Sequence, residues 1–445
     1  MNKGFLNSLR TISIVSGVMC GYILGVIAYI FPTFQHDFGI TTLQVSILAG
    51  AILFGCFISS IYTGVLTDLL GRKVVSLIVF SLFLLGGILF DVSHTIALFY
   101  TARLIQGLAF GMAVIVLPIY FAEMSPKEKR GQVITSFQLS MTSGILIAGV
   151  LGMFIIHGTH WHTLITITLI FPLFLMYKMV KMPESAHFYV GKRRFEKAKE
   201  VIKIIHPSSD CEESLLLIQK SRSEKLSFKE GVALLFKRSN LTAIIIVTCA
   251  VSLNQLTGIN AFLQCSLSIL RDSGINSNLM GIIGGISITL INFIATILTL
   301  SLVEKIGRKT ILKIGTSGLF ITLIILSLLH FILPTGVLTG WVTLIGIIML
   351  IGFFAFGPGG VILVLSAELL PNRVRSLGIS IAFTVGALVG MFFVSDFMKI
   401  AKTIGYSGLF LMIACFVVGY FVIAFKIPET RGKALEEIEA AWQEK

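Results

Sequence analysis

The sequence has few charged residues for its length. Of its 445 residues, 13% are charged and 55% are hydrophobic, whereas about a quarter of the residues of a soluble domain are charged. The mean hydropathy is +0.94. This shortage of charge excludes a water-soluble globular domain and indicates a membrane protein.

Cysteine is scarce as well, with six residues in the chain. Five of them lie inside long apolar runs, and Cys211 lies in a charged segment. Lone cysteines in apolar helices are usually packing residues. The pattern therefore favours neither a disulfide framework nor a zinc site, and we expect no cofactor.

Long apolar segments are abundant. A helix that crosses about 30 Å of hydrocarbon needs about 20 apolar residues. Twelve such runs lie near residues 11–31, 43–66, 74–90, 96–119, 132–156, 161–180, 241–270, 279–302, 310–333, 340–367, 376–397 and 404–426. We therefore expect an all-α membrane protein with twelve transmembrane helices.

The basic residues are distributed unevenly between the predicted loops. With the N-terminus in the cytoplasm, alternate loops hold all 35 Lys and Arg except Arg103, Arg271, Lys399 and Lys402. This asymmetry follows the positive-inside rule. The net charge of +13 therefore reports topology and not nucleic-acid binding. The distribution of Lys and Arg predicts a multi-pass protein with both termini in the cytoplasm. We expect this protein in the plasma membrane.

Three short motifs occur twice, in the same order. The pairs are TDLLGRK at 67–73 with VEKIGRK at 303–309, EMSPKEKRG at 123–131 with ELLPNRVRS at 368–376, and PES at 183–185 with PET at 428–430. Such a repeat indicates that six helices have been duplicated. We expect a first six-helix bundle at 1–180, a second at 240–427 and a cytoplasmic tail at 428–445.

The segment between the halves, residues 181–239, is rich in charge. Phe195, Ala198, Val201, Ile202 and Ile205 recur at helical spacing, and SFKE at 227–230 has the pattern of a capping box. These features predict a cytoplasmic helical linker domain. A disordered linker is the alternative.

The first two repeated motifs each combine a carboxylate with Arg or Lys beside a predicted helix end. Arginine offers a rigid fork of donors that can bridge a carboxylate or cap helix carbonyls. We interpret the motifs as the ion pairs of a cytoplasmic gate, and simple anchoring at lipid headgroups as the alternative. The gate residues would be Asp68, Arg72, Glu123, Arg130, Glu304, Arg308, Glu368 and Arg375.

Taken with RLIQG, NQLTGIN, GPGG and PETRGKALEEIE, these motifs resemble those of the sugar porter family of the major facilitator superfamily. The resemblance covers nearly the whole chain. It implies two six-helix bundles around a central cavity, a sugar bound at mid-membrane, and alternating access by rocking of the bundles. It also implies a transporter and not an enzyme. The partners would be a small sugar and the lipid bilayer, with the monomer sufficient for function.

The resemblance also implies the substrate-binding residues, all of them uncharged amides. An amide offers both donor and acceptor to a sugar hydroxyl without placing a charge in the bilayer, and Gly258 would permit local unwinding between these residues. A role in helix–helix contacts is the alternative. The residues are Gln138, Asn254, Gln255, Asn260 and Asn292.

The sequence departs from the family pattern where aromatic side chains are usual. Gln264 and Cys265 replace a pair of tyrosines that gate the outer side, Leu363 replaces a tryptophan, and Gly386 replaces an asparagine. These departures leave open a transporter of the same fold for a polyol or a small organic ion.

Proton coupling is not expected. Proton-coupled relatives carry an aspartate at the position of Ile23, whereas its partner, Arg103, is retained and would face a polar cavity or lie near the outer end. We therefore expect facilitated uniport, with proton-coupled symport as the alternative. A non-transporting sensor is a third class, for which a long regulatory tail would be expected.

Overall fold

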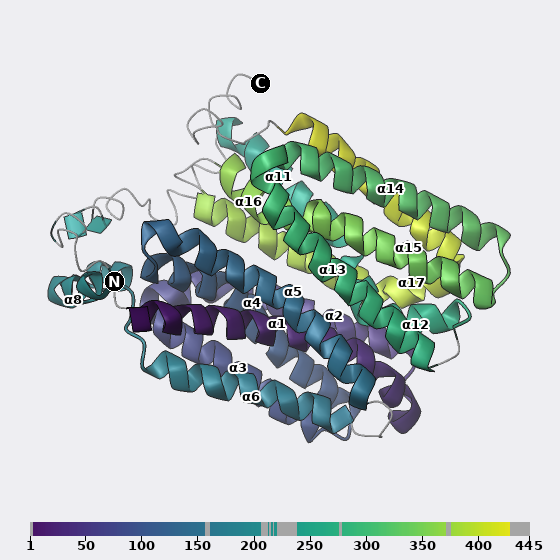
Figure 1. Cartoon of the computed structure of the whole chain (residues 1–445), viewed down its shortest axis with the longest axis horizontal. Helices are drawn as coiled ribbons and strands as arrows, with labels where there is room; N and C mark the ends of the chain where they lie inside the picture. Colours follow the sequence, from purple (N-terminus) through teal and green to yellow (C-terminus); the bar gives the residue numbers. More distant parts are fainter. Residues whose placement is uncertain are drawn as a thin grey trace. The chain divides into compact units, whose positions relative to one another are not determined.

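The computed structural model describes residues 3–155, 161–205, 212, 215–216, 218–219, 238–275, 278–370 and 375–427. All regular structure in these ranges is helical. Within these ranges the first half contains six long helices (Figure 1). They are α1 (Lys3–Phe38), α2 (Thr42–Leu70), α3 (Arg72–Asp91), α4 (Ile96–Met124), α5 (Lys127–Ile155) and α6 (Trp161–Val180). Each is long and apolar enough to cross a membrane, as the sequence predicts.

Two of the spans in the second half are broken within the membrane. The seventh span consists of α11 (Arg238–Leu256) and α12 (Ile259–Asp272), and the tenth of α15 (Val337–Phe356) and α16 (Pro358–Leu369). Between them lie the uninterrupted helices α13 (Asn278–Ile306) and α14 (Arg308–Ile332). Gly258 separates α11 from α12 with φ of 80°, so the unwinding predicted there is confirmed.

The last helix, α17 (Arg375–Lys426), holds two spans. Its 52 residues would extend for about 78 Å if straight, far more than the membrane thickness. Gly405 interrupts it with φ of 74°, a conformation that glycine adopts without steric cost. The prediction of twelve transmembrane helices is therefore confirmed.

The linker between the halves contains two described helices, α7 (Ala186–Gly191) and α8 (Phe195–Ile205). Of the apolar residues that predicted α8, Ala198, Val201, Ile202 and Ile205 are buried, whereas Phe195 is partly exposed. The helical part of this prediction is confirmed. The capping-box sequence at 227–230 and the tail at 428–445 lie outside the described residues.

Contacts between residues divide the chain into two compact units. One contains residues 1–23, 54–145 and 162–227, and the other contains 24–53, 146–161 and 228–445. The division cuts α1, α2 and α5 partway along, so one end of each packs with the helices of the second half. The bundle boundaries drawn from the sequence remain a prediction.

Candidate functional site

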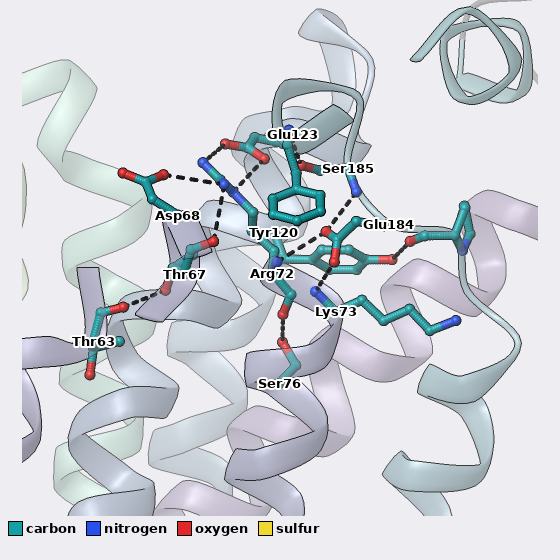
Figure 2. Close-up of polar contacts among 12 residues, drawn as sticks. Thr63, Thr67, Asp68, Arg72, Lys73, Ser76, Tyr120, Glu123, Glu184 and Ser185 are labelled. Atoms are coloured by element: carbon teal, nitrogen blue, oxygen red, sulfur yellow. Dashed lines mark hydrogen bonds and ion pairs between the residues drawn. The ribbon is translucent and has the colours of Figure 1, made fainter. Parts of the chain in front are cut away.

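The first candidate site is a cluster of charges around Arg72, which begins α3. The side chain of Arg72 is 5% exposed, and its Nε lies 3.0 Å from Oε2 of Glu123. Its Nη2 donates to Oε1 of Glu123 at 3.2 Å, and its Nη1 lies 3.3 Å from Oδ1 of Asp68. Figure 2 shows these side chains converging from α2, α3 and α4. Arg72 therefore joins three helix ends.

The N-terminus of α3 is capped by Glu184, a residue from the PES motif. Its Oε1 accepts the backbone N–H of Arg72 at 3.0 Å, and its Oε2 accepts that of Lys73 at 2.9 Å (Figure 2). The backbone N–H of Ser185 also donates to Oε1, at 2.8 Å. Helix α3 has no side-chain cap from its own N-cap residue, Gly71. Glu184 therefore satisfies amides that the helix cannot pair internally.

Burial raises the pKa of the Glu184 carboxyl, although its three backbone donors and the charge of Arg72 oppose the shift. Glu184→Gln replaces one accepting oxygen with an NH₂ group, so at least one amide loses its partner. We expect a loss of about 1–3 kcal/mol in the free energy of unfolding. Denaturant titration in detergent micelles measures it, with the substitution of an exposed carboxylate of α8, Glu196→Gln, as the control.

The same experiment has a pH signature. A carboxyl whose pKa is raised in the folded state holds its proton more tightly there, so stability falls as the pH rises from about 4.5 through the raised value. The Gln variant lacks this decline. The stability difference between wild type and Glu184→Gln should therefore shrink as the pH rises through that window. A constant difference would contradict the assignment.

The second half repeats part of this arrangement. Arg308, which begins α14, places Nη2 3.4 Å from Oε1 of Glu368, as Arg72 does with Glu123. The lysine of each Gly-Arg-Lys motif caps the end of the sixth helix in its half. Lys73 Nζ donates to the carbonyl of Val180 at 2.8 Å, and Lys309 Nζ donates to that of Phe425 at 3.0 Å. Sequence reasoning missed both lysine caps and the Glu184 cap.

One predicted gate residue does not enter these clusters, and two lie outside the description of side chains. Arg130 is exposed, and its side chain has no ion pair with any residue in the described part of the chain. The side chains of Glu304 and Arg375 lie outside the described residues. The described clusters each lie within one half of the chain.

The second candidate site lies at the break in the seventh span. Asn260 Nδ2 donates to Oε1 of Gln255 at 2.8 Å across Gly258. Both amides are half-buried. A Cβ atom on Gly390 of α17 would lie 3.0 Å from Oε1 of Gln255, so a glycine there leaves room for the amide. The break therefore holds two predicted sugar-binding residues in one hydrogen-bonded pair.

The other predicted amides have different surroundings. Asn254 is 7% exposed and lies beside the buried hydroxyl of Tyr420 in α17, and its Nδ2 has no hydrogen-bond partner among the described residues. Asn292 is buried in α13. Gln138 is half-buried in α5, in the other unit.

Arg103 of α4 is buried within the first half, 1% exposed. Its Nη1 donates to the backbone carbonyl of Ile23 at 3.3 Å and to Oε1 of Gln106 at 3.2 Å. The guanidinium therefore contacts the backbone of α1 at Ile23. Within the described residues, no group of three or more His, Cys, Asp or Glu is placed to hold a metal ion.

Comparison with known proteins gives a consistent result. Residues 5–442 match the sequence profile of the family described as "Sugar (and other) transporter". The glucose transporter GlcP of Staphylococcus epidermidis is 30% identical over 97% of this chain and 96% of its own length. The arabinose-proton symporter of Escherichia coli K12 is 27% identical over 96% of this chain and 91% of its own length.

Among solved structures, the fold is similar to that of the proton:xylose symporter XylE from E. coli. The TM-score is 0.80 at 22% sequence identity, and the match covers 99% of this chain and 100% of the other. This likeness supports the major facilitator fold predicted from the sequence.

Proposed function

The chain belongs to the sugar transporter family, and from this premise we propose that it carries a monosaccharide across the membrane by facilitated uniport. It is a multi-pass integral membrane transporter and not an enzyme. The observation that carries the proposal is the amide pair of Gln255 and Asn260 at the broken seventh span. A pair of amides at an unwound helix can exchange its mutual hydrogen bond for bonds to sugar hydroxyls. Uptake of a panel of radiolabelled sugars into proteoliposomes tests it.

Gln255→Ala is expected to weaken sugar binding. The change removes one or two hydrogen bonds, each contributing about 0.5–1.5 kcal/mol, so affinity should fall roughly 3- to 100-fold. We expect Gln138→Ala to lower the affinity for sugar by a factor in the same range, because Gln138 is a predicted sugar contact. Equilibrium binding to purified protein measures the change, and Gln132→Ala, on the exposed start of α5, is the control. Unaltered affinity in both variants at normal expression would remove these amides from the site.

We further propose that the Arg72 and Arg308 clusters act in the cytoplasmic gate. The clusters fix the ends of α2, α3 and α4 in one half and of α14 and α16 in the other. Alternating access requires such ends to move as rigid groups. Glu368→Gln should raise the labelling of a cysteine introduced in the inner cavity, because only the outward-facing state closes that side. Constant or reduced labelling would contradict a role in the gate and would favour simple anchoring of these charges at the lipid headgroups.

The remaining assignments concern topology and assembly. We propose that the protein resides in the plasma membrane with both termini in the cytoplasm, and that a monomer is sufficient for transport. The distribution of Lys and Arg supports the orientation. Protease protection of a C-terminal tag in right-side-out vesicles tests the orientation, and uptake by single-copy nanodiscs fused to liposomes tests the monomer.

A transporter of the same fold for a polyol is the second candidate. Gly386 of α17 stands where the family usually has asparagine, and a Cβ atom there would lie 2.6 Å from Cγ1 of Val251. A side chain here would have to displace the Val251 methyl group, and the glycine that is present offers no polar group to a substrate. Competition between sugars and polyols for binding to purified protein separates the two candidates.

A further inference from the structure

Tyr29 occupies an unusual position in the second half of α1. It is 2% exposed, although a tyrosine placed where helices cross would ordinarily hold them apart. Residues 24–53 belong to the same compact unit as residues 146–161 and the helices of the second half. The surroundings of Tyr29 can therefore be described within that unit.

Three glycines form a socket for the Tyr29 ring. A Cβ atom on Gly149 would lie 2.7 Å from the hydroxyl of Tyr29, one on Gly152 would lie 2.8 Å from its Cγ, and one on Gly285 would lie 3.0 Å from its hydroxyl. Gly149 and Gly152 belong to α5, and Gly285 belongs to α13. No larger residue fits at these positions without displacing the ring.

The socket also has an apolar wall and a polar end. Leu267 of α12 packs against Tyr29 in one buried cluster, and the hydroxyls of Tyr29 and of Thr289 in α13 both lie beside Gly149, 2.7 Å and 3.2 Å from the position of a Cβ atom there. The ring therefore contacts helices from both halves of the sequence in one place.

The socket lies at the ends of the helices opposite the Gly-Arg-Lys turns. Residues 24–53 cover the end of α1 and the start of α2, whereas the first Gly-Arg-Lys turn follows the end of α2. A second contact at the same end joins α2 to α17, where the Ser46 hydroxyl donates to the backbone carbonyl of Ser395 at 2.9 Å. These contacts join helices of the two halves of the sequence at the end that the predicted topology assigns to the exterior.

We propose that Tyr29 closes the outer end of the substrate path by docking into the socket of Gly149, Gly152 and Gly285. Thr289, whose hydroxyl lies beside Gly149 as the Tyr29 hydroxyl does, is about one helical turn before Asn292, a predicted sugar-binding residue. Opening to the exterior would separate α1 and α5 from α12 and α13, so the ring would have to leave the socket. The inference rests on the proposed transport function and assigns a positioning role in it to one side chain.

The test measures closure directly, by cross-linking Ser46→Cys to Ser395→Cys in purified full-length protein whose six native cysteines are replaced. A short bismaleimide should join these positions in the unmodified background, because the two residues are in contact. We expect Tyr29→Ala and Gly152→Ala each to lower the cross-linked fraction at least threefold. The first removes the ring, and the second places a methyl group where the ring lies. Tyr29→Phe, which keeps the ring, should retain most of the cross-linking.

Non-additivity and a matched glycine distinguish docking from general packing. If Gly152→Ala acts by expelling the ring, it should have no further effect in the Tyr29→Ala background. Gly131→Ala in the same helix α5 is the control, because a Cβ atom there meets no atom within 4 Å. If Gly152→Ala does not fold, Gly285→Ala takes its place.

Unchanged cross-linking in Tyr29→Ala and Gly152→Ala, additive effects, or a background that does not cross-link would each overturn the proposal. The readout does not depend on the solute. Absence of sugar uptake with normal cross-linking would therefore count against the proposed function alone.

Discussion

Arg72→Ala is expected to lower the free energy of unfolding by about 3–5 kcal/mol. The side chain of Arg72 is 5% exposed and that of Glu123 is 13% exposed, so the substitution leaves a mostly buried carboxylate without its cation. It also removes a donor from the carbonyl of Thr67, which Arg72 Nη1 reaches at 3.3 Å. The ends of α2 and α4 then lose their common partner. Denaturant titration of purified protein in detergent micelles measures the loss.

Two variants separate this explanation from a general effect of removing positive charge. Arg130→Ala removes an arginine that is exposed and unpaired within the described residues, so it should change stability by less than about 0.5 kcal/mol. The double change Arg72→Met with Glu123→Met removes both buried charges and should recover part of the loss. A loss in Arg130→Ala as large as that in Arg72→Ala would refute the role of the buried pair.

A pH gradient is expected to drive no accumulation of substrate. A symporter that moves one proton with each sugar could concentrate the sugar about tenfold for each pH unit. Here Ile23 cannot bind a proton, and the guanidinium of Arg103 that faces it remains charged at any working pH. Uptake into proteoliposomes with an acidic exterior should therefore stop when the concentrations are equal.

The geometry of Arg103 also predicts how coupling could be introduced. Its Nη1 lies 3.3 Å from the carbonyl oxygen of Ile23, so the carboxylate of Ile23→Asp would stand within reach of the guanidinium. This variant should acquire pH-dependent transport, and the further change Arg103→Ala should abolish that dependence. Accumulation by the unmodified protein that a proton ionophore abolishes would show that another group carries the proton. The candidates would then be Asp37, Asp396, or Asp91 in its 2.9 Å pair with His162.

The spans could be predicted from the sequence because burial in lipid demands long apolar runs, which few other structures require. The partners of Arg72 could be predicted in part, because the acids recur at fixed spacing in both halves. The sequence does not predict that Glu184 belongs to the Arg72 cluster. A carboxylate that caps backbone amides needs no basic side chain as a partner, so no charged residue in the sequence indicates the contact. Its partners are the N–H groups of Arg72 and Lys73, which every residue except proline carries.

The Tyr29 socket was missed for a related reason. Its glycines are recognisable only when α1, α5 and α13 are seen together, because each glycine alone resembles the many others in the chain. Arg130 shows the opposite case. It shares a motif with Glu123, but the turn at the start of α5 leaves its side chain in solvent, and spacing along the sequence does not report the direction of a side chain.

The cap on α3 also has a consequence for the order in which the chain is built. Glu184 follows Arg72 by 112 residues, which a ribosome adds in about 6–22 s at ordinary rates of synthesis. During that interval the backbone N–H groups of Arg72 and Lys73 lack the carboxylate that caps them in the folded protein. Glu184 nevertheless emerges well before Gly307. The first half can therefore form the Glu184 cap on α3 before the second Gly-Arg-Lys motif has been synthesised.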